Sequence, residues 1–194
     1  MTFTSCAGVL LTGGASRRMG TDKATLVVRG EALAARAARV LTSVCAPALE
    51  VGPGVTALAC AREEPPGAGP LAAFLTGVDA LGAPGPVLLL ACDLPLVDEH
   101  VLRVLAEWPG SASAVPVVRG RPQYACARWS PAAIAAGRAA FDAGEQALRA
   151  LAAVDAEELR ESAFTGATAA GVAHPADVFA DLDTPEDLRR LGLS

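Results

Sequence analysis

Two short apolar runs constrain the fold more than any other feature of this 194-residue sequence. Residues 7–12 and 87–92 are apolar at almost every position, without the polar alternation of a half-exposed strand. A strand of this kind must be covered on both faces, as in the parallel sheet of an α/β protein. The two runs therefore predict buried strands of a mostly parallel sheet.

The rest of the chain alternates extended and helical patterns. Further strands are predicted at 49–51, 56–61, 113–118, 123–129 and 178–183, and helices at 31–45, 70–81, 98–107, 131–141, 145–154 and from 185 onward. Proline suits the first turn of a helix, as at Pro70 and Pro185, and Thr184 is an N-cap residue. The alternation predicts an α/β layer fold, and the length fits one domain over 1–194. Sites in such sheets form at the carboxyl ends of strands, here after Leu11, Cys92 and Phe179.

The composition excludes several classes of protein. Acidic residues outnumber basic residues by 21 to 16, whereas a surface that binds nucleic acid is usually basic. No apolar stretch reaches the roughly 20 residues of a membrane helix, so no membrane association is expected. The five cysteines form no CxxC pair, which argues against a zinc site or a redox dithiol. We expect a cytoplasmic protein with reduced thiols.

The loop that follows the first apolar run combines glycines with basic side chains, the elements of a phosphate-binding loop. These residues are Gly13, Gly14, Arg17, Arg18 and Lys23. The spacing fits neither the Walker loop nor the GxGxxG dinucleotide loop. Lys23 is the only lysine, beside 15 arginines, and its compact ammonium suits a phosphate oxygen in a tight loop. The alternatives are a glycine turn with solvated arginines and a lysine left on the surface by chance.

Three aspartates are candidate magnesium ligands. Asp93 directly follows the apolar run 87–92, where a lone carboxylate is costly unless it is paired or binds a metal. Asp181 and Asp183 alternate along a predicted strand, so they would share one face and repel each other unless a cation or the positive start of a helix compensates. The alternatives are that Asp93 caps the next helix, where Asp98 stands nearer, and that Asp181 and Asp183 belong to an ordinary acidic N-cap before Thr184 and Pro185.

Two further segments are weaker candidates. Residues 62–71, rich in glycine and proline, could offer rigid backbone groups and glutamates to a base or ribose, although an exposed turn is the simpler interpretation. Arg119 and Arg121 flank a predicted turn and could meet an anionic second substrate, and a solvated hairpin is equally consistent with them. The two histidines have no partner spacing that indicates nucleophilic catalysis.

Four segments taken together resemble one known family, the MobA-like nucleotidyltransferases, typified by molybdenum cofactor guanylyltransferase. They are Leu11–Lys23, Pro66–Ala72, Cys92–Pro95 and Asp181–Leu188, in the order and spacing of that family. The resemblance implies a Rossmann-like three-layer nucleotidyltransferase fold with a small β insertion. It also implies Mg²⁺-dependent transfer of GMP from GTP to the phosphate of molybdopterin, which gives molybdopterin guanine dinucleotide and pyrophosphate. Molybdoenzymes or cofactor-delivery proteins would be its partners.

The resemblance also assigns roles to residues. The nucleotide would be held by backbone groups of Leu11, Thr12, Gly13 and Gly14 and by Glu63, Gly69, Pro70 and Leu71. Arg18 and Lys23 would bind its phosphates and stabilise the leaving pyrophosphate. Asp93 would hold Mg²⁺, with Asp183 as the second ligand and Asp181 close behind. The acceptor phosphate is itself the nucleophile, so no catalytic base is required.

The choice of base is less constrained by the same motifs. Gly-Gly in the first loop and Gly-Pro-Leu in the second resemble guanylyl enzymes. The chain departs from the family at Thr12, where alanine is usual, and at Ala73, where glycine is usual. A cytidylyl- or other nucleotidyltransferase with a different phosphorylated acceptor therefore stays open, as does a non-catalytic nucleotide-binding protein.

Overall fold

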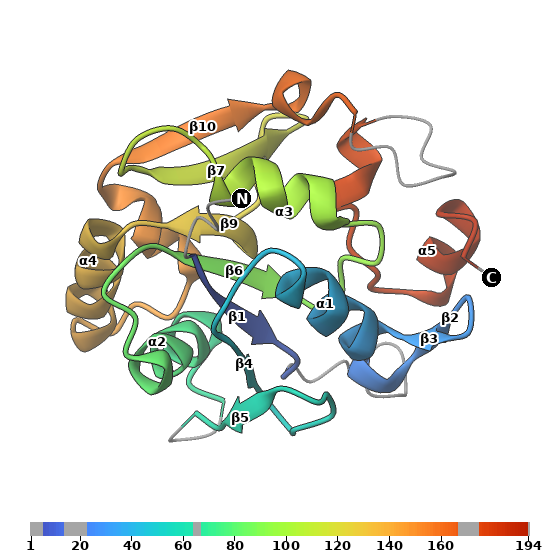
Figure 1. Ribbon diagram of the computed structural model, residues 1–194, viewed down its shortest axis with the longest axis horizontal. Helices are drawn as coiled ribbons and strands as arrows, with labels where there is room; N and C mark the ends of the chain where they lie inside the picture. The colour runs from blue at the N-terminus through green and yellow to red at the C-terminus, as the bar shows by residue number, and fades with distance from the viewer. Residues whose placement is uncertain (1–5, 14–22, 64–66, 167–174, 194) are drawn as a thin grey trace.

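Strand β1 (Ala7–Leu11) lies inside a mixed sheet, as its fully buried sequence predicts (Figure 1). The computed structural model describes residues 6–13, 23–63, 67–166 and 175–193. Within this part, the sheet has eight strands in the order β10-β7-β9-β6-β1-β4-β5, with β8 paired to β7. The other strands are β4 (Ala48–Val51), β5 (Ala59–Ala61), β6 (Val87–Ala91), β7 (Ser113–Val118), β8 (Arg121–Pro122), β9 (Cys126–Trp129) and β10 (Ala156–Arg160).

Parallel pairing dominates the half of the sheet that contains β1. Strands β5, β4, β1 and β6 are mutually parallel, β9 is antiparallel to both β6 and β7, and β10 is parallel to β7. The α/β fold with a mostly parallel sheet is thus confirmed. The carboxyl ends of β1, β4 and β6 meet at one edge of the sheet, because parallel strands run in the same direction.

Helices cover both faces of the sheet, as its doubly apolar strands require (Figure 1). Helices α1 (Leu33–Thr42) and α3 (Glu99–Ala106) pack over the face that contains Leu10. Helices α2 (Pro70–Leu81) and α4 (Pro131–Asp142) pack over the face that contains Val9. Helix α2 approaches closely at Gly77, where an added Cβ would lie 2.8 Å from the Val9 side chain. None of the described helices is long and apolar enough to span a membrane.

A third, smaller core joins the two ends of the described chain. Helix α5 (Pro185–Arg190) follows the segment 180–184 and packs near the hairpin of β2 (Val27–Val28) and β3 (Glu31–Ala32). The buried residues of this third core are Val28, Leu33, Leu96, Leu182 and Leu193. Leu26, which directly follows the 3₁₀ turn Lys23–Thr25, also packs against this core, so the turn lies close to the segment that contains Leu182 and its neighbouring aspartates.

The predicted strand at 178–183 is wrong. Residues Pro175–Phe179 form a 3₁₀ helix, and residues 180–183 have no regular structure. Val178 and Phe179 are both buried in the core beneath α3 instead of alternating between faces. Asp181 and Asp183 therefore do not share the face of a strand. The Leu182 N–H donates to the Asp93 carbonyl oxygen at 2.9 Å, which still brings this segment to the end of β6.

Other differences concern how elements begin and end. The predicted helix at 145–154 is a 3₁₀ helix at Leu148–Ala153, and the edge strand β10 was not predicted because its exposed residues are charged. Residues 31–32 pair with β2, so α1 begins at Leu33. The strand predicted at 123–129 begins at Cys126. The strand predicted at 56–61 begins at Ala59, because the N–H of Thr56 donates to a buried carboxylate described below.

Candidate active site

Three adjoining cavities lie along the carboxyl ends of the central strands. An inner cavity of about 470 Å³ lies beside β1, β4 and the start of α2, lined among others by Leu11, Gly13, Gly52, Pro53, Glu63 and Gly69. A middle cavity of about 400 Å³ is lined by Thr12, Lys23 and Asp93, among others. An outer cavity of about 760 Å³ extends from Asp93 to the β7–β8 turn. Pro70 lines all three, so the cavities adjoin one another at the start of α2.

The middle cavity contains a lysine between two carboxylates. The Lys23 Nζ atom lies 3.8 Å from the Asp93 Oδ2 atom and donates a hydrogen bond to the Asp183 Oδ1 atom. The Lys23 side chain is only 15% exposed. Burial alone would lower its pKa, but the hydrogen bond to Asp183 and the nearby carboxylates outweigh burial and raise the pKa. Lys23 is therefore a charged ammonium at the end of the phosphate-binding loop predicted from the sequence.

Asp93 is an electrostatically strained carboxylate. Burial raises its pKa above the ordinary value, and the charges of Asp181 and Asp183 raise it further, whereas Lys23 opposes the shift. The Cys92 N–H donates to the Leu11 carbonyl oxygen at 3.0 Å, which fixes Asp93 at the mouth of the sheet. A carboxylate held among like charges favours a bound cation.

The aspartates around Lys23 fit a magnesium ion whose remaining ligands are phosphate oxygens of the substrate. In the described ranges, no group of three or more His, Cys, Asp or Glu side chains is arranged to hold a metal by itself. Mg²⁺ usually takes one or two carboxylates together with phosphate oxygens and water. Asp93 and Asp183, now joined by Lys23, are such a pair. Asp181 is more exposed and lines the outer cavity.

Asp183 is positioned by the start of α5. The Thr184 side chain accepts from the Asp187 N–H, and the Asp187 carboxylate accepts from the N–H groups of Asp183 and Thr184, forming a capping box. The hydrogen bonds from Arg190 and Thr184 lower the pKa of Asp187 to about 2. The predicted N-cap at Thr184 is thus confirmed, and it orients the aspartate that contacts Lys23.

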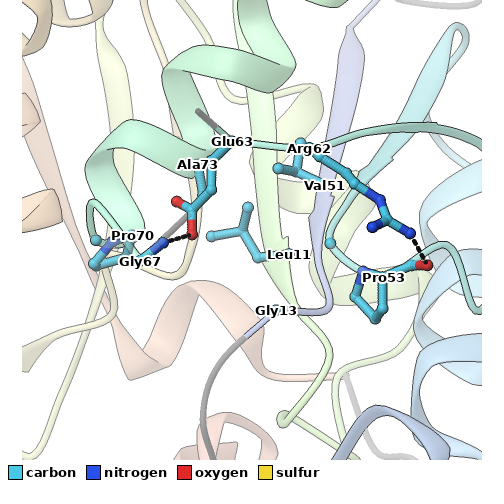
Figure 2. A pocket seen from close by; sticks show the side chains of 11 residues that line it. Leu11, Gly13, Val51, Pro53, Arg62, Glu63, Gly67, Pro70 and Ala73 are labelled. Carbon is cyan, nitrogen blue, oxygen red and sulfur yellow. Dashed lines mark hydrogen bonds between the residues drawn. The ribbon is translucent and has the colours of Figure 1, made fainter. Parts of the chain in front are cut away.

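Glu63 and Pro53 lie on opposite sides of the inner cavity, with Leu11 between them (Figure 2). Its Oε1 atom accepts a hydrogen bond of 2.7 Å from the Gly67 N–H, whereas its Oε2 atom is buried without a partner in the described part of the chain. An unpartnered buried oxygen is costly unless a ligand supplies a donor. On the opposite rim, the Arg62 side chain donates to the Pro53 carbonyl oxygen at 3.3 Å (Figure 2).

A second buried carboxylate, Glu50, was not among the predicted site residues. It lies on β4 beside β1 and is 0% exposed. The Thr12 hydroxyl donates to its Oε1 atom at 2.6 Å. Burial would raise the pKa of Glu50, but hydrogen bonds from Thr12 and from residues 55–56 outweigh it and lower the pKa. The only sequence signal was one acidic residue within the apolar run Ala48–Val51.

The outer cavity has an acidic end at Asp93 and Asp181 and a basic end at the β7–β8 turn. Arg119 is engaged there by Asp177, with a nitrogen–oxygen distance of 2.9 Å. Arg121 also lines the cavity, and among the described residues no ion pair is found for it. Tyr124, which the sequence did not single out, lines the same cavity.

The remaining predicted site residues fall into two groups. Gly14 and Arg18 lie outside the described residues. Leu71 is described, but it is 0% exposed in the core beneath α2, and its N–H donates to the Gln146 carbonyl oxygen at 3.2 Å. Leu71 therefore supports the start of α2 and lines none of the three cavities.

Comparison with protein families gives one match across most of the chain. The model of the MobA-like NTP transferase domain matches residues 8–163. This range includes β1, β4 and β6 and both cavities that adjoin β1.

Individual relatives agree with that match. The probable molybdenum cofactor guanylyltransferase of Chloroflexus aggregans is 34% identical over 156 residues, which are 74% of each chain. The molybdenum cofactor guanylyltransferase of Rhodobacter capsulatus is 32% identical over 193 residues, or 95% of this chain and 93% of the relative. The crystal structure of molybdopterin-guanine dinucleotide biosynthesis protein A from Archaeoglobus fulgidus has the same fold. It has a TM-score of 0.77 and 19% identity, and the match covers 95% of this chain and 96% of that one.

Proposed function

Since the chain belongs to the MobA-like NTP transferase family, we propose that it transfers GMP from GTP to the phosphate of molybdopterin. The products are molybdopterin guanine dinucleotide and pyrophosphate. The observation that carries this proposal is the position of Lys23 between Asp93 and Asp183, in a cavity that adjoins the inner and the outer cavity. Such an arrangement suits a reaction that joins two substrates at a phosphate.

The inner cavity suits the nucleoside. It is mostly apolar, and no residue in the described ranges donates to the Glu63 Oε2 atom. Guanine offers adjacent N–H donors on its Watson–Crick edge, and a carboxylate supplies only acceptors. Glu63 therefore favours guanine, which presents two adjacent donor groups, over cytosine and adenine, which each present one amino donor beside an acceptor.

Lys23 and the loop before it suit the triphosphate. The ammonium of Lys23 has three donors and a raised pKa, so it stays charged and can move from the carboxylates to phosphate oxygens. Leu11 and Gly13 line both the inner and the middle cavity, and Thr12 lines the middle cavity. We assign phosphate contacts also to Gly14 and Arg18, which lie outside the described residues.

The reaction needs alignment and charge neutralisation. An oxygen of the acceptor phosphate attacks the α-phosphorus of GTP, the new P–O bond forms, and the bond to the bridging oxygen of pyrophosphate breaks. The acceptor oxygen is already anionic, so no residue has to remove a proton. Lys23 would stabilise negative charge on the departing pyrophosphate.

Asp93 and Asp183 would hold Mg²⁺, with Asp181 close enough to contribute through its charge. The ion, when bound, would neutralise phosphate charge. The carboxylates themselves would orient the nucleotide by fixing where that positive charge sits.

The outer cavity suits the acceptor. Its acidic end adjoins the reacting phosphates, and its basic end at Arg121 could contact an anionic or hydrogen-bond-accepting group farther along the acceptor. Delivery to a molybdoenzyme or to a cofactor-delivery protein would follow. None of the five cysteines forms a disulfide within the part of the chain that the structure describes, and reduced thiols are typical of proteins in the reducing cytoplasm.

The competing candidates share the fold. A cytidylyltransferase would use the same cluster with CTP, and a non-catalytic nucleotide-binding protein would need no metal site. The combination of Lys23, Asp93 and Asp183 favours an enzyme over a binding protein.

Calorimetric titration with GTP, CTP and ATP, each with and without Mg²⁺, tests the proposal. We expect GTP to bind most tightly and Mg²⁺ to strengthen its binding, followed by pyrophosphate release when molybdopterin is added. Lys23→Met should weaken GTP binding by about tenfold or more, whereas Arg103→Met, which removes an exposed charge on α3, should not. Tighter binding of CTP would show that the protein is a cytidylyltransferase. GTP binding without any product from molybdopterin would show that molybdopterin is not the acceptor.

A further inference from the structure

Glu50 joins two loops that come from different strands. Its carboxylate accepts five hydrogen bonds of 2.6–3.0 Å: from the hydroxyl of Thr12, from the N–H groups of Gly54, Val55 and Thr56, and from the hydroxyl of Thr56. Thr12 belongs to the loop after β1, and the other donors belong to the loop after β4. One buried side chain therefore fixes two loops at once.

These two loops form one wall of the inner cavity. Gly13 contributes from the first loop, and Gly52 and Pro53 contribute from the second. The backbones are in close contact, because an added Cβ on Gly52 would lie 2.2 Å from the Thr12 Oγ1 atom and 2.8 Å from the Gly13 nitrogen. The Thr12 N–H also donates to the Val51 carbonyl oxygen at 3.1 Å. The width of the cavity on this side thus depends on the spacing between the two loops.

We propose that Glu50, through the Thr12 hydroxyl, is a positioning residue that sets this spacing and so determines nucleotide affinity. This inference rests on the proposed function for the nature of the ligand. It also gives a role to Thr12, whose hydroxyl donates to Glu50. Glu50 touches no substrate in this arrangement and acts only through the loops.

The arrangement requires a carboxylate at this position. Both oxygens of Glu50 face donors, three on Oε1 and two on Oε2. A glutamine side chain has one oxygen and one NH₂ group in place of the two carboxylate oxygens. The loop donors on one side would therefore face the NH₂ group, which cannot accept their hydrogen bonds. Glu50→Gln is nearly isosteric and should still separate the two loops.

The two threonines provide a matched test. Thr12→Val and Thr56→Val each remove one hydroxyl from Glu50 without a large change in volume. Thr12 directly precedes Gly13, which lines the inner cavity, whereas Thr56 lies beyond the lining residues Gly52 and Pro53. We expect Thr12→Val to raise the Kd for GTP by about tenfold. Thr56→Val should leave that Kd within about twofold, although it should lose at least as much stability, because the Thr56 hydroxyl also accepts from the Leu58 N–H at 3.2 Å. Thr12→Ser, which keeps the hydroxyl, should restore the affinity.

The measurements are calorimetric GTP titrations with Mg²⁺ and urea unfolding of the same variants. Equal Kd values for Thr12→Val and Thr56→Val would overturn the inference, as would a Thr12→Ser variant as weak as Thr12→Val. If the wild-type protein binds CTP or ATP instead of GTP, the guanylyl proposal fails, and the same comparison with that nucleotide still decides the role of Glu50. A wild-type protein that binds none of the three overturns both. Glu50→Gln is expected to weaken affinity at least as much as Thr12→Val, and the threonine pair decides the matter if Glu50→Gln does not fold.

Discussion

Two carboxylates on the strands that flank β1 have opposite environments. Glu50 on β4 accepts five hydrogen bonds, and these lower its pKa despite full burial. Asp93, just after β6, lies 3.8 Å from Lys23 and near two further aspartates, and burial raises its pKa. The first carboxylate is stabilised in its charged form by hydrogen bonds from the protein, whereas the second has a raised pKa although the Lys23 ammonium lies nearby.

The difference separates a structural role from a chemical one. A buried charge with all its donors in place stabilises the loops around it and has no capacity left for a ligand. A buried charge among like charges costs stability and keeps its capacity to bind. Glu50 should therefore control folding and loop geometry, and Asp93 should control turnover.

The largest expected effect is on turnover in Asp93→Asn. This isosteric change removes the charge that we assign to Mg²⁺ binding, so the rate of pyrophosphate release from GTP and molybdopterin should fall by about 10²- to 10³-fold. Stability should stay constant or rise by up to about 1 kcal/mol, because the repulsion from Asp181 and Asp183 is relieved.

Asp98→Asn is the matched control for Asp93→Asn. Asp98 lies in the same segment and caps α3 by accepting from the Val101 N–H at 3.0 Å, and asparagine is also a good N-cap. Its turnover should equal that of the wild type. If Asp93→Asn retains full turnover, Asp93 has no role in the reaction, and the proposed division of roles between Asp93 and Glu50 is wrong.

Glu50→Ala should have the largest effect on stability. It leaves three backbone N–H groups and two hydroxyls without their acceptor, which should cost about 3 kcal/mol of the free energy of unfolding. Urea unfolding monitored by circular dichroism measures this change. A loss no larger than that of Asp93→Asn would contradict the division of roles.

The pH dependence of stability gives a smaller and more specific effect. Because the pKa of Glu50 is lowered in the folded protein, the unfolded chain binds more protons, and stability rises with pH up to the unfolded pKa of about 4.3. The stabilisation by ionised Glu50 is complete above that value and is lost as the pH falls through the lowered folded value. The stability gap between wild type and Glu50→Gln, measured by urea unfolding from pH 7 to pH 3, should therefore narrow at the acidic end. A stability gap that widens on acidification would contradict the lowered pKa of Glu50.

The sequence was sufficient to predict the parts of the molecule with strong local signals. The runs at 7–12 and 87–92 gave β1 and β6, Pro70 and Thr184 marked the starts of α2 and α5, and the parallel order gathered the loops into one site. Lys23 stood out because no other lysine occurs in the chain. Its contacts with Asp93 and Asp183 agree with the grouping of these residues as one site.

Features that depend on distant contacts could not be predicted. Glu50 is a single acidic residue in an apolar run, and only the fold brings Thr12 to it from 38 positions away. The segment 178–183 has an alternating pattern, but packing of Val178 and Phe179 in the core overrides that pattern. Strand β10 has a polar edge and pairs with a strand more than 40 positions earlier, Ala156 with Ser113. Each case is decided by tertiary packing and not by local propensity.

Asp187 extends the comparison to a third carboxylate and has the smallest expected effect. Like Glu50 it is satisfied, since it accepts from the Asp183 and Thr184 N–H groups and from Arg190. Asp187→Ala removes half of the capping box and should cost about 1 kcal/mol. Turnover should fall only a few-fold, because Asp183 keeps its contact with Lys23 but loses its backbone anchor.

Glu186→Ala is the matched control for Asp187→Ala, because Glu186 lies in the same turn and pairs only with the exposed Arg189 among the described residues. Hydrogen exchange at the Asp183 and Thr184 amides should accelerate in Asp187→Ala and not in Glu186→Ala. Equal exchange in both variants would show that the small core around Leu182, and not the capping box, positions Asp183.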